Sequence, residues 1–186
     1  MSFTPVIAIH GGAGTLTRSH ISPEQEANYH SALGTILRAA QQLLANGGSA
    51  LDAVSLAVEM LEDCPLFNAG LGAVFTRDAT HELDAAVMNG ADLRAGAVAG
   101  VSHIRRPVRA ARAVMEHSEH VLLIGAGAEK FAQDCGLELV APDFFSTEPR
   151  LAQLRLAQAS GAPIVGFNVR PNAKAREMIE RQKVTL

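Results

Sequence analysis

Residues 62–100 limit the possible folds of this 186-residue chain more than any other segment does. In this segment, glycine-rich loops alternate with short β-type segments. The run contains Asn68-Ala69-Gly70-Leu71-Gly72, continues through Glu82-Leu83-Asp84-Ala85, and ends in Gly96-Ala97-Val98-Ala99-Gly100. A glycine weakens a strand unless another segment of backbone must approach it closely. The run therefore predicts strands and loops that pack tightly against neighbouring backbone.

Length and composition favour one globular α/β unit with a core of small aliphatic side chains. Hydrophobic residues make up 48% of the chain, aromatic residues make up 4%, and there is no Trp. Such a core suits helices that pack closely on a sheet, and a chain of this length can bury one. The formal net charge is −3. This charge gives no basic footprint for a nucleic acid, and the few aromatic side chains leave little surface on which bases could stack.

Several absences indicate a cytosolic protein that has no membrane partner. Cys64 and Cys135 are far apart in the sequence, so we expect two buried, reduced thiols and neither a disulfide nor a metal site. The first residues, MSFTPVIAIHGG, lack a basic region and a long apolar stretch, which argues against a signal peptide. No apolar run reaches the ~20 residues that span a bilayer.

Local patterns predict the order of helices and strands. Ser22, Pro23 and Gln25 form a helix start, and the helix should continue to about Ala45. A second helix should begin at Ser49 and carry an apolar face. The residues of that face would be Val54, Val58 and Leu61. Further helices are predicted at 107–115, 125–136, 149–159 and 173–183, and strands at 5–9, 73–76, 82–88, 95–101, 121–124 and 164–169.

Two glycine loops follow predicted strands but match no nucleotide-binding motif. His10-Gly11-Gly12-Ala13-Gly14 lacks the Lys-Ser/Thr of a P-loop, and Gly125-Ala126-Gly127 lacks the third glycine of a dinucleotide fingerprint. We expect both loops to allow close approach of backbone to backbone. We expect His10 to be a packed, hydrogen-bonded side chain rather than a ligand.

Asn68 is the strongest single polar candidate for chemistry. Its amide could bind near a reacting carbonyl, or it could simply support its own turn. Glu82 and Asp84 should share one face of a strand, opposite Leu83, Ala85 and Val87. Such a carboxylate pair could serve acid–base work or hold a metal. The histidines at 81, 103, 117 and 120 show no spacing typical of a zinc or Ser-His-Asp site.

An ordered series of motifs resembles the α-subunit of the plant-type L-asparaginase and isoaspartyl peptidase family over residues 6–161. The segments that carry the resemblance are AIHGGAG, CPLFNAGLGAVFTRD, HELDAAVM, AGAVAGVSHIR, PVRAARAVME and HVLLIGAGAEKFA. The resemblance implies the αββα sandwich of N-terminal-nucleophile hydrolases, of which this chain would form only the α-subunit half. Asn89 and Arg106 depart from the family pattern, which often has Asp and Asn there, and we expect both changes to be tolerated.

The resemblance also implies roles for individual residues. Gly11 and Gly12 would border the active site, and Asn68 would lie next to the catalytic threonine. A loop of backbone carbonyls would bind a structural sodium ion, and no catalytic cofactor is implied. The carbonyls would be those of Leu61, Glu62, Cys64, Phe67, Ala69 and Leu71.

Members of this family cut their own chain before a Thr in a Gly-Thr-Val-Gly-type sequence. The freed Thr then attacks the β-amide of L-asparagine or of β-aspartyl dipeptides, using its α-amino group as base. The printed sequence contains no Gly-Thr-Val-Gly, and Thr185 follows Val184. We therefore expect no activity from this chain alone, and a β-subunit as partner in a dimer of αβ units. Which of the two substrates is preferred stays open.

The last residues depart from the family. Residues 163–186 resemble a short strand–helix segment of bacterial translation initiation factor 2. The chain accordingly divides into an asparaginase-like portion, 1–161, and a foreign or atypical tail, 162–186. A fragment this short cannot build its own core, so no function of the initiation factor is transferred.

Three functions remain open from the sequence. The chain could be the α-portion of an amidohydrolase whose β-subunit is supplied separately. It could be a truncated or chimaeric fragment without catalysis that serves only as an interaction partner. A weaker alternative is a protein that binds an anion through its glycine loops. In either of the first two cases, strand edges and apolar faces would be open, and the isolated chain should aggregate or depend on a partner.

Overall fold

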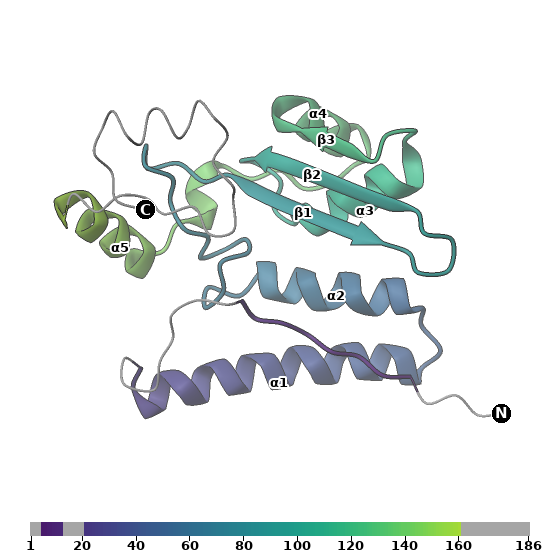
Figure 1. The fold of residues 1–186 in the computed structure, drawn as a ribbon, viewed down its shortest axis with the longest axis horizontal. Coiled ribbons are helices and arrows are strands. Elements are labelled where there is room, and N and C mark those ends of the chain that lie inside the picture. Colours follow the sequence, from purple (N-terminus) through teal and green to yellow (C-terminus); the bar gives the residue numbers. More distant parts are fainter. Residues whose placement is uncertain (1–4, 13–20, 161–186) are drawn as a thin grey trace, which may run out of the picture.

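The computed structural model describes residues 5–12 and 21–160 and has an α/β architecture (Figure 1). Two long helices, α1 (Pro23–Ala45) and α2 (Ala50–Glu62), precede the sheet. The sheet consists of β1 (Leu83–Met88), β2 (Ala95–Val101) and β3 (Leu122–Ile124). Helices α3 (Pro107–His117) and α4 (Gly125–Asp134), the 3-10 helix η1 (Pro142–Phe145) and α5 (Glu148–Ser160) complete the order. No helix in the described ranges is long and apolar enough to cross a membrane.

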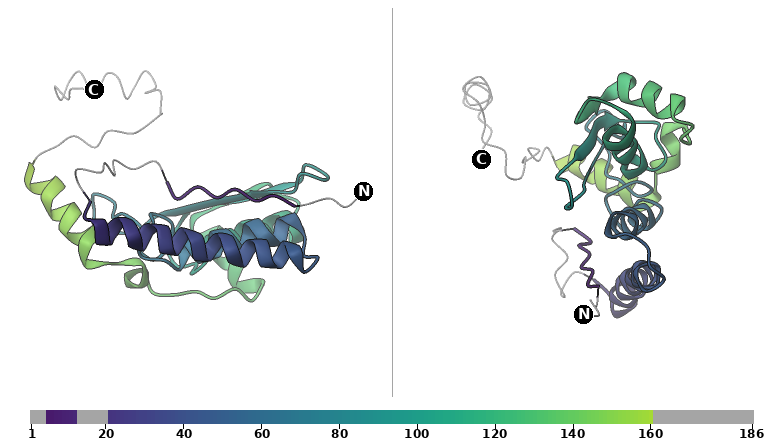
Figure 2. Two further views of the ribbon diagram at one scale, coloured as in Figure 1. Left: turned by 90° about the horizontal axis from the view of Figure 1, so that it is seen from below. Right: turned by 90° about the vertical axis from the view of Figure 1, so that its right-hand side faces the viewer.

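Helices α1 and α2 form an antiparallel pair that lies beside the sheet (Figures 1 and 2). The side chain of Ser22 accepts from Gln25 N, and Gln25 Oε1 accepts from Ser22 N, which completes the predicted capping box of α1. Ser49 caps α2 in the predicted way. The two helices share a buried cluster made of Ile36, Ala40, Ala53, Ala57, Leu61 and Phe67.

Helix α2 is buried on two sides, which corrects its predicted apolar face. Leu61 is buried, but Val54 is 41% exposed and Val58 is half-buried. The small residues Ala53 and Ala57 join Leu61 in the cluster with α1 instead. The polar side chains Ser55, Glu59 and Glu62 of α2 are also buried. A single hydrophobic stripe cannot describe a helix that is packed between two neighbours.

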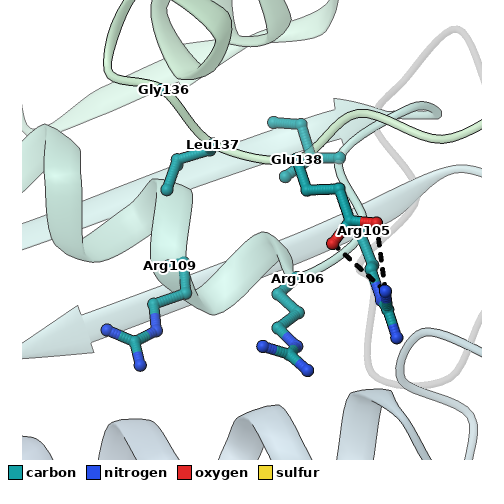
Figure 3. A pocket seen from close by; sticks show the side chains of 7 residues that line it. Arg105, Arg106, Arg109, Gly136, Leu137 and Glu138 are labelled. Atoms are coloured by element: carbon teal, nitrogen blue, oxygen red, sulfur yellow. Dashed lines mark hydrogen bonds and ion pairs between the residues drawn. The ribbon is translucent and has the colours of Figure 1, made fainter.

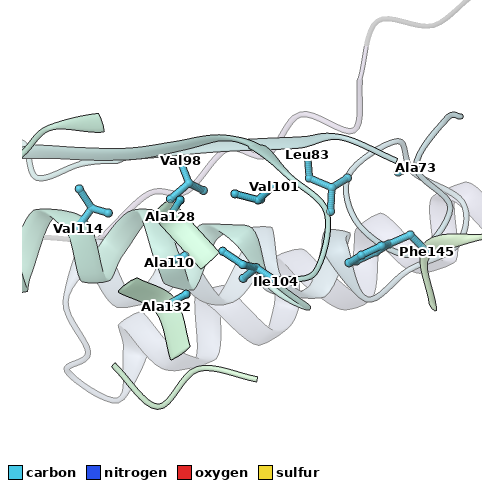
Figure 4. Packing of buried hydrophobic residues seen from close by; sticks show 10 residues of the cluster. All are labelled: Ala73, Leu83, Val98, Val101, Ile104, Ala110, Val114, Ala128, Ala132 and Phe145. Carbon is cyan, nitrogen blue, oxygen red and sulfur yellow. The ribbon is translucent and has the colours of Figure 1, made fainter. Parts of the chain in front are cut away.

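The sheet is mixed, and the described helices cover one of its faces. Strand β2 pairs antiparallel with β1 and parallel with β3. Helices α3 and α4 pack on one face of this sheet. Their shared core is shown in Figure 4 and contains Ala73, Leu83, Val98, Val101, Ile104, Ala110, Val114, Ala128, Ala132 and Phe145.

The second face of the sheet is mostly apolar, with the exposed Asp84 at one end of β1, and it is uncovered by the described residues. The ladder places Ala86, Ala97 and Leu122 in one row, and Met88 and Ala95 in another. Met88 is 56% exposed, Leu122 is 53% exposed and Ile124 is 66% exposed. We call this surface the open face and define it by the residues that share it: Ala86, Met88, Ala95, Ala97, Ala99, Leu122 and Ile124.

Gly96 explains why glycine recurs in the β2 segment. A Cβ built there would lie 2.2 Å from Ala111 O and 2.5 Å from Met115 N of α3. Both contacts are with backbone atoms, so α3 can approach β2 this closely only at a glycine. The predicted close approach of backbone to backbone is confirmed at this position.

Two predicted strands are absent from the described residues. Residues 5–9 have no regular structure, and Val6 is 90% exposed. Ile7 and Ile9 contact the α1–α2 cluster, so the segment lies on helices, where it has no strand to pair with. Residues 73–76 likewise form no ladder. The predicted strand and helix of the tail, 162–186, lie outside the described residues.

The two thiols are less buried than predicted. Cys64 is half-buried, and Cys135 is exposed. Cys135 is the C-cap residue of α4, where the chain turns at the surface. Both cysteines are free thiols.

Candidate functional site

The segment between α2 and β1 folds back on the C-terminus of α2. Leu71 N donates to Glu62 O at 2.7 Å, and Phe67 N donates to Cys64 O at 3.3 Å. Gly72 has a φ of +88°, and a Cβ there would lie 2.3 Å from Pro65 O. A side chain at position 72 would therefore be strained and would also collide with backbone. This tight loop, residues 61–72, holds most of the residues that the sequence singled out.

Asn68 lies on the outer side of this loop. Its Oδ1 accepts a hydrogen bond from Val74 N at 2.9 Å, and the residue is exposed. The amide oxygen thus supports the local turn, as the simpler of the two sequence interpretations expected. Within the described residues no hydrogen bond uses the NH₂ group of Asn68, which can donate two.

The glycine segment near the N-terminus contacts the same loop. A Cβ at Gly11 would lie 2.9 Å from Cε1 of Phe67, the residue before Asn68. Gly12 has a φ of +110°, and its N–H donates to His10 Nδ1 at 3.1 Å. The structure therefore brings Gly11 against the Asn68 loop. His10 is hydrogen-bonded as expected but exposed rather than packed.

The six carbonyl groups that the resemblance assigned to sodium differ in their hydrogen bonding. Those of Leu61, Glu62 and Cys64 each accept a backbone N–H, from Cys64, Leu71 and Phe67 respectively. Within the described residues, no hydrogen bond reaches the carbonyl oxygens of Phe67, Ala69 and Leu71. Oxygen donors of this kind suit a hard cation. The donor set therefore fits sodium, and the backbone, not the side chains, would hold the ion.

The predicted carboxylate pair, Glu82 and Asp84, lies at the start of β1. Glu82 and Asp84 are both exposed, while Leu83 and Val87 are buried, so the predicted alternation is confirmed. Asp84 Oδ1 accepts from Gly100 N at 2.8 Å, across an irregular step in the β1–β2 register. No group of three or more His, Cys, Asp or Glu residues in the described ranges could hold a metal.

A charged seam joins α2 to the start of α3, and the sequence did not reveal it. Arg106 Nη2 donates to Asp63 Oδ2 at 2.6 Å, and Arg109 Nε lies 2.6 Å from Glu59 Oε1. Arg105 Nη1 donates to both carboxylate oxygens of Glu138 (Figure 3). A pocket of about 230 Å³ opens beside these residues. Each arginine faces a carboxylate, so the seam is balanced in charge and offers little attraction to a further anion.

Glu62 is the most unusual group in this seam. It is 2% exposed, and its Oε1 accepts from Val108 N at 2.9 Å at the start of α3. Burial, reinforced by the nearby carboxylates of Glu59 and Asp63, raises the pKa of Glu62 to about 8. Glu62 is therefore largely protonated at pH 7. Its Oε2 has no hydrogen-bond partner among the described residues.

His81 is another buried titratable group that sequence analysis left without a role. It is 2% exposed, and its ring lies 4.2 Å, between centroids, from that of Phe75. Burial lowers the pKa of His81. Its ring nitrogens contact Val74 O at 3.2 Å and Ser146 Oγ at 3.0 Å. Val74 is 7 residues from His81 in the sequence and Ser146 is 65 residues away, so a local sequence pattern could not have indicated the contact with Ser146.

Known proteins are similar to this chain over most of its length. A family described as Asparaginase matches residues 3–184. The isoaspartyl peptidase of Escherichia coli K12 is 56% identical over 173 residues, which are 93% of this chain and 54% of that protein. A putative isoaspartyl peptidase/L-asparaginase of Dictyostelium discoideum is 51% identical over 158 residues, 85% of this chain and 46% of that protein.

More distant relatives carry a second name. The plant-type L-asparaginase of Thermococcus kodakarensis is 48% identical over 147 residues, 79% of this chain and 45% of that protein. The chain thus spans about half the length of the curated relatives that it matches. With a family match over nearly its whole length, the chain belongs to the asparaginase family that includes isoaspartyl peptidases and plant-type L-asparaginases.

Proposed function

We propose that this chain is the α-subunit-like part of a threonine N-terminal hydrolase. The complete enzyme would cleave the β-amide of L-asparagine or of β-aspartyl dipeptides. The relatives' names supply the substrate class, and the chain covers about half of each relative. The chain would be inactive alone, because the nucleophilic Thr would come from a second half that follows in the relatives.

The orientation of Asn68 is the observation that carries this proposal. Val74 N occupies the amide oxygen at 2.9 Å, so the exposed NH₂ group is the part that can face a substrate or a nucleophile. Hydrogen-bond donors held in place stabilise the negative charge that develops on the oxygen of an attacked amide. Asn68 would therefore act as a donor at the reacting centre, with Gly11 packed against the same loop.

The open face supports the αββα sandwich that this function requires. Sheets that pack face to face bury apolar side chains between them at a spacing of about 10 Å. Leu122, Ile124 and Met88 present such a surface, and α3 and α4 already cover the other side. The second sheet of the sandwich would come from the β-subunit. Two αβ units would then assemble as a dimer.

A structural sodium ion in loop 61–72 belongs to the same proposal. The carbonyls of Phe67, Ala69 and Leu71 would bind it with one lone pair each from Leu61, Glu62 and Cys64. The ion would hold the loop, and therefore Asn68, without taking part in the reaction. Replacing NaCl with choline chloride should lower the melting temperature, whereas an unchanged melting temperature would argue against the ion.

A cytosolic location completes the proposal. Cys64 and Cys135 are both unpaired thiols, and Cys135 is exposed. Exposed thiols persist in reduced form in compartments that glutathione and thioredoxin keep reducing.

Hydrolysis of β-Asp-Leu by this chain, with and without a separately produced second half of the Escherichia coli relative, tests the function. We expect no turnover by either chain alone and turnover by the mixture. The variants Asn68→Ala and Asn68→Asp should both lose about 100-fold in kcat, because neither keeps the NH₂ donor. Asn28→Ala, on the exposed surface of α1, serves as a control that changes an amide elsewhere.

The outcomes separate the two main functions. Turnover that is lost in Asn68→Ala and retained in Asn28→Ala would support the amidohydrolase. A mixture that assembles but hydrolyses neither β-Asp-Leu nor L-asparagine would refute it. That result would instead support an interaction fragment without catalysis.

A further inference from the structure

Residues 72–76 begin at the last residue of loop 61–72 and hold Asn68. We call this segment the strap. Val74 N donates to Asn68 Oδ1 at 2.9 Å, while Val74 O lies 3.2 Å from His81 Nδ1. The two faces of one short segment thus link an exposed amide to a buried imidazole. A shift of Val74 would move the hydrogen bond that orients the Asn68 side chain.

The partners of His81 define which ring nitrogen carries the proton. A backbone carbonyl can only accept, so the Nδ1 that faces Val74 O must be protonated. Burial lowers the pKa of His81, so the ring is neutral at pH 7 and Nε2 keeps its lone pair. Nε2 then accepts from the hydroxyl of Ser146 at 3.0 Å. Every polar atom of this buried ring therefore has a defined partner.

The strap is also fixed at its first residue. Gly72 N donates to Phe145 O at 2.9 Å, and Arg150 Nε donates to Gly72 O at 2.8 Å. The ring of Phe145 also packs edge-on against His81, at 6.1 Å between centroids. Residues 145–150 consequently hold both the start of the strap and the imidazole that holds its middle.

We propose that His81 is a positioning residue for Asn68: its Nδ1–H holds Val74 O, so that Val74 N keeps the Asn68 amide oxygen in place and the NH₂ group directed outward. This inference rests on the proposed function, because fixing the NH₂ group affects catalysis only if Asn68 donates a hydrogen bond at the reacting centre. Its structural content, the coupling of His81 to Asn68 through Val74, can be measured without turnover. Ser146 orients the ring and does not itself hold the strap.

Two amide substitutions separate the roles of the ring nitrogens. In His81→Asn the new amide lies as many bonds from Cα as Nδ1 does, so a donor to Val74 O is retained. In His81→Gln the amide lies as far from Cα as Nε2 does, so the partner of Ser146 is retained and the donor to Val74 O is lost. Both variants lose the ring that packs on Phe75 and Phe145, which makes them a matched pair.

Hydrogen exchange of the Val74 amide, measured by mass spectrometry with residue-level fragmentation, is the first readout. We expect His81→Gln to exchange about tenfold faster than wild type, and His81→Asn to stay within about threefold, as loss of one hydrogen bond predicts. Equal acceleration in the two variants would overturn the proposal, because it would mean that loss of the ring, not of Nδ1–H, loosens the strap.

Kinetics of the assembled enzyme on β-Asp-Leu is the second readout. A positioned donor acts in the transition state, so His81→Gln should lower kcat about tenfold with KM within about twofold, and His81→Asn should restore kcat. Equal loss of kcat in both variants would contradict the proposal. If wild type shows no turnover while the exchange rates still separate, the reaction is refuted and the coupling of His81 to Asn68 stands.

Discussion

Glu62 at the end of α2 caps α3, because its Oε1 accepts from Val108 N at 2.9 Å. The N-cap residue of α3, Arg106, makes no side-chain cap of its own. A helix start has N–H groups without intrahelical partners, so a buried start needs an acceptor from elsewhere. Glu62 supplies it from a distant helix, and its backbone carbonyl also receives Leu71 N of the candidate site loop. One residue thus connects α2, α3 and the loop of Asn68.

Replacing Glu62 with Gln should stabilise the protein in a pH-dependent way. The pKa of Glu62 is raised from its usual 4.5 to about 8 by burial, so the unfolded chain releases this proton more readily than the folded one. Below pH 4.5 Glu62 is protonated in both states, so it adds no pH dependence to the free energy of unfolding. That free energy then falls as the pH rises from 4.5 towards 8. Gln keeps an acceptor for Val108 N and never ionises.

Urea denaturation at pH 5 and at pH 8 measures this effect. We expect Glu62→Gln to be within about 1 kcal/mol of wild type at pH 5 and more stable by roughly 4 kcal/mol at pH 8, because about 1.4 kcal/mol per pKa unit accumulates between pH 4.5 and 8. The exposed Glu82→Gln provides the control and should leave the pH dependence unchanged. A pH dependence identical in wild type and Glu62→Gln would contradict the raised pKa.

Removing Arg109 from its ion pair with Glu59 should destabilise the protein, because the Glu59 carboxylate would stay buried. Glu59 is 4% exposed, and Arg109 Nε lies 2.6 Å from its Oε1, while Arg106 lies further away at 3.6 Å. Arg109→Met leaves a buried carboxylate with only the more distant arginine, and we expect a loss of about 2–3 kcal/mol. Glu59→Met in the same chain removes the buried charge and should recover most of that loss.

A double-mutant cycle followed by urea denaturation gives the coupling energy of this pair. The arginine is half exposed, so the attraction itself is weakened by solvent, and the cost comes mainly from the buried carboxylate. If the double variant is as unstable as the sum of both single variants, the two side chains are not coupled.

Gly96→Ala should destabilise the packing of α3 on β2. The added Cβ would meet Ala111 O at 2.2 Å and Met115 N at 2.5 Å, and backbone atoms cannot rotate away. We expect a loss of about 3 kcal/mol in unfolding free energy. Gly127→Ala in α4 is the matched control, because nothing lies within 4 Å of its Cβ, and it should gain about 0.5–1 kcal/mol. Equal effects of the two substitutions would contradict the observed approach.

Local patterns predicted the elements whose determinants lie within a few residues of one another. The capping box of Ser22 and Gln25 identified the start of α1, and alternation identified the buried Leu83 and Val87 of β1. Both signals come from the geometry of a single helix turn or of a single strand. They are therefore present before any tertiary contact forms.

Features that depend on distant partners could not be predicted in this way. Residues 5–9 are apolar and strand-like, but a strand exists only where another strand pairs with it, and these residues lie on α1 and α2 instead. Val54 followed a helical stripe, yet α2 is buried on two sides. The roles of Glu62 and His81 depend on Val108 and Ser146, which are 46 and 65 residues away.

The open face should control both self-association and assembly. Leu122 and Ile124 lie on this face of β3 and are 53% and 66% exposed. A lysine at either position would bury a charge whenever another sheet packs there, so Leu122→Lys and Ile124→Lys should keep the isolated chain monomeric and weaken binding of the proposed β-subunit at least tenfold. Leu156→Lys on α5, where the leucine is 72% exposed, is the matched control. Analytical ultracentrifugation would contradict the sandwich if all three variants assembled as wild type does.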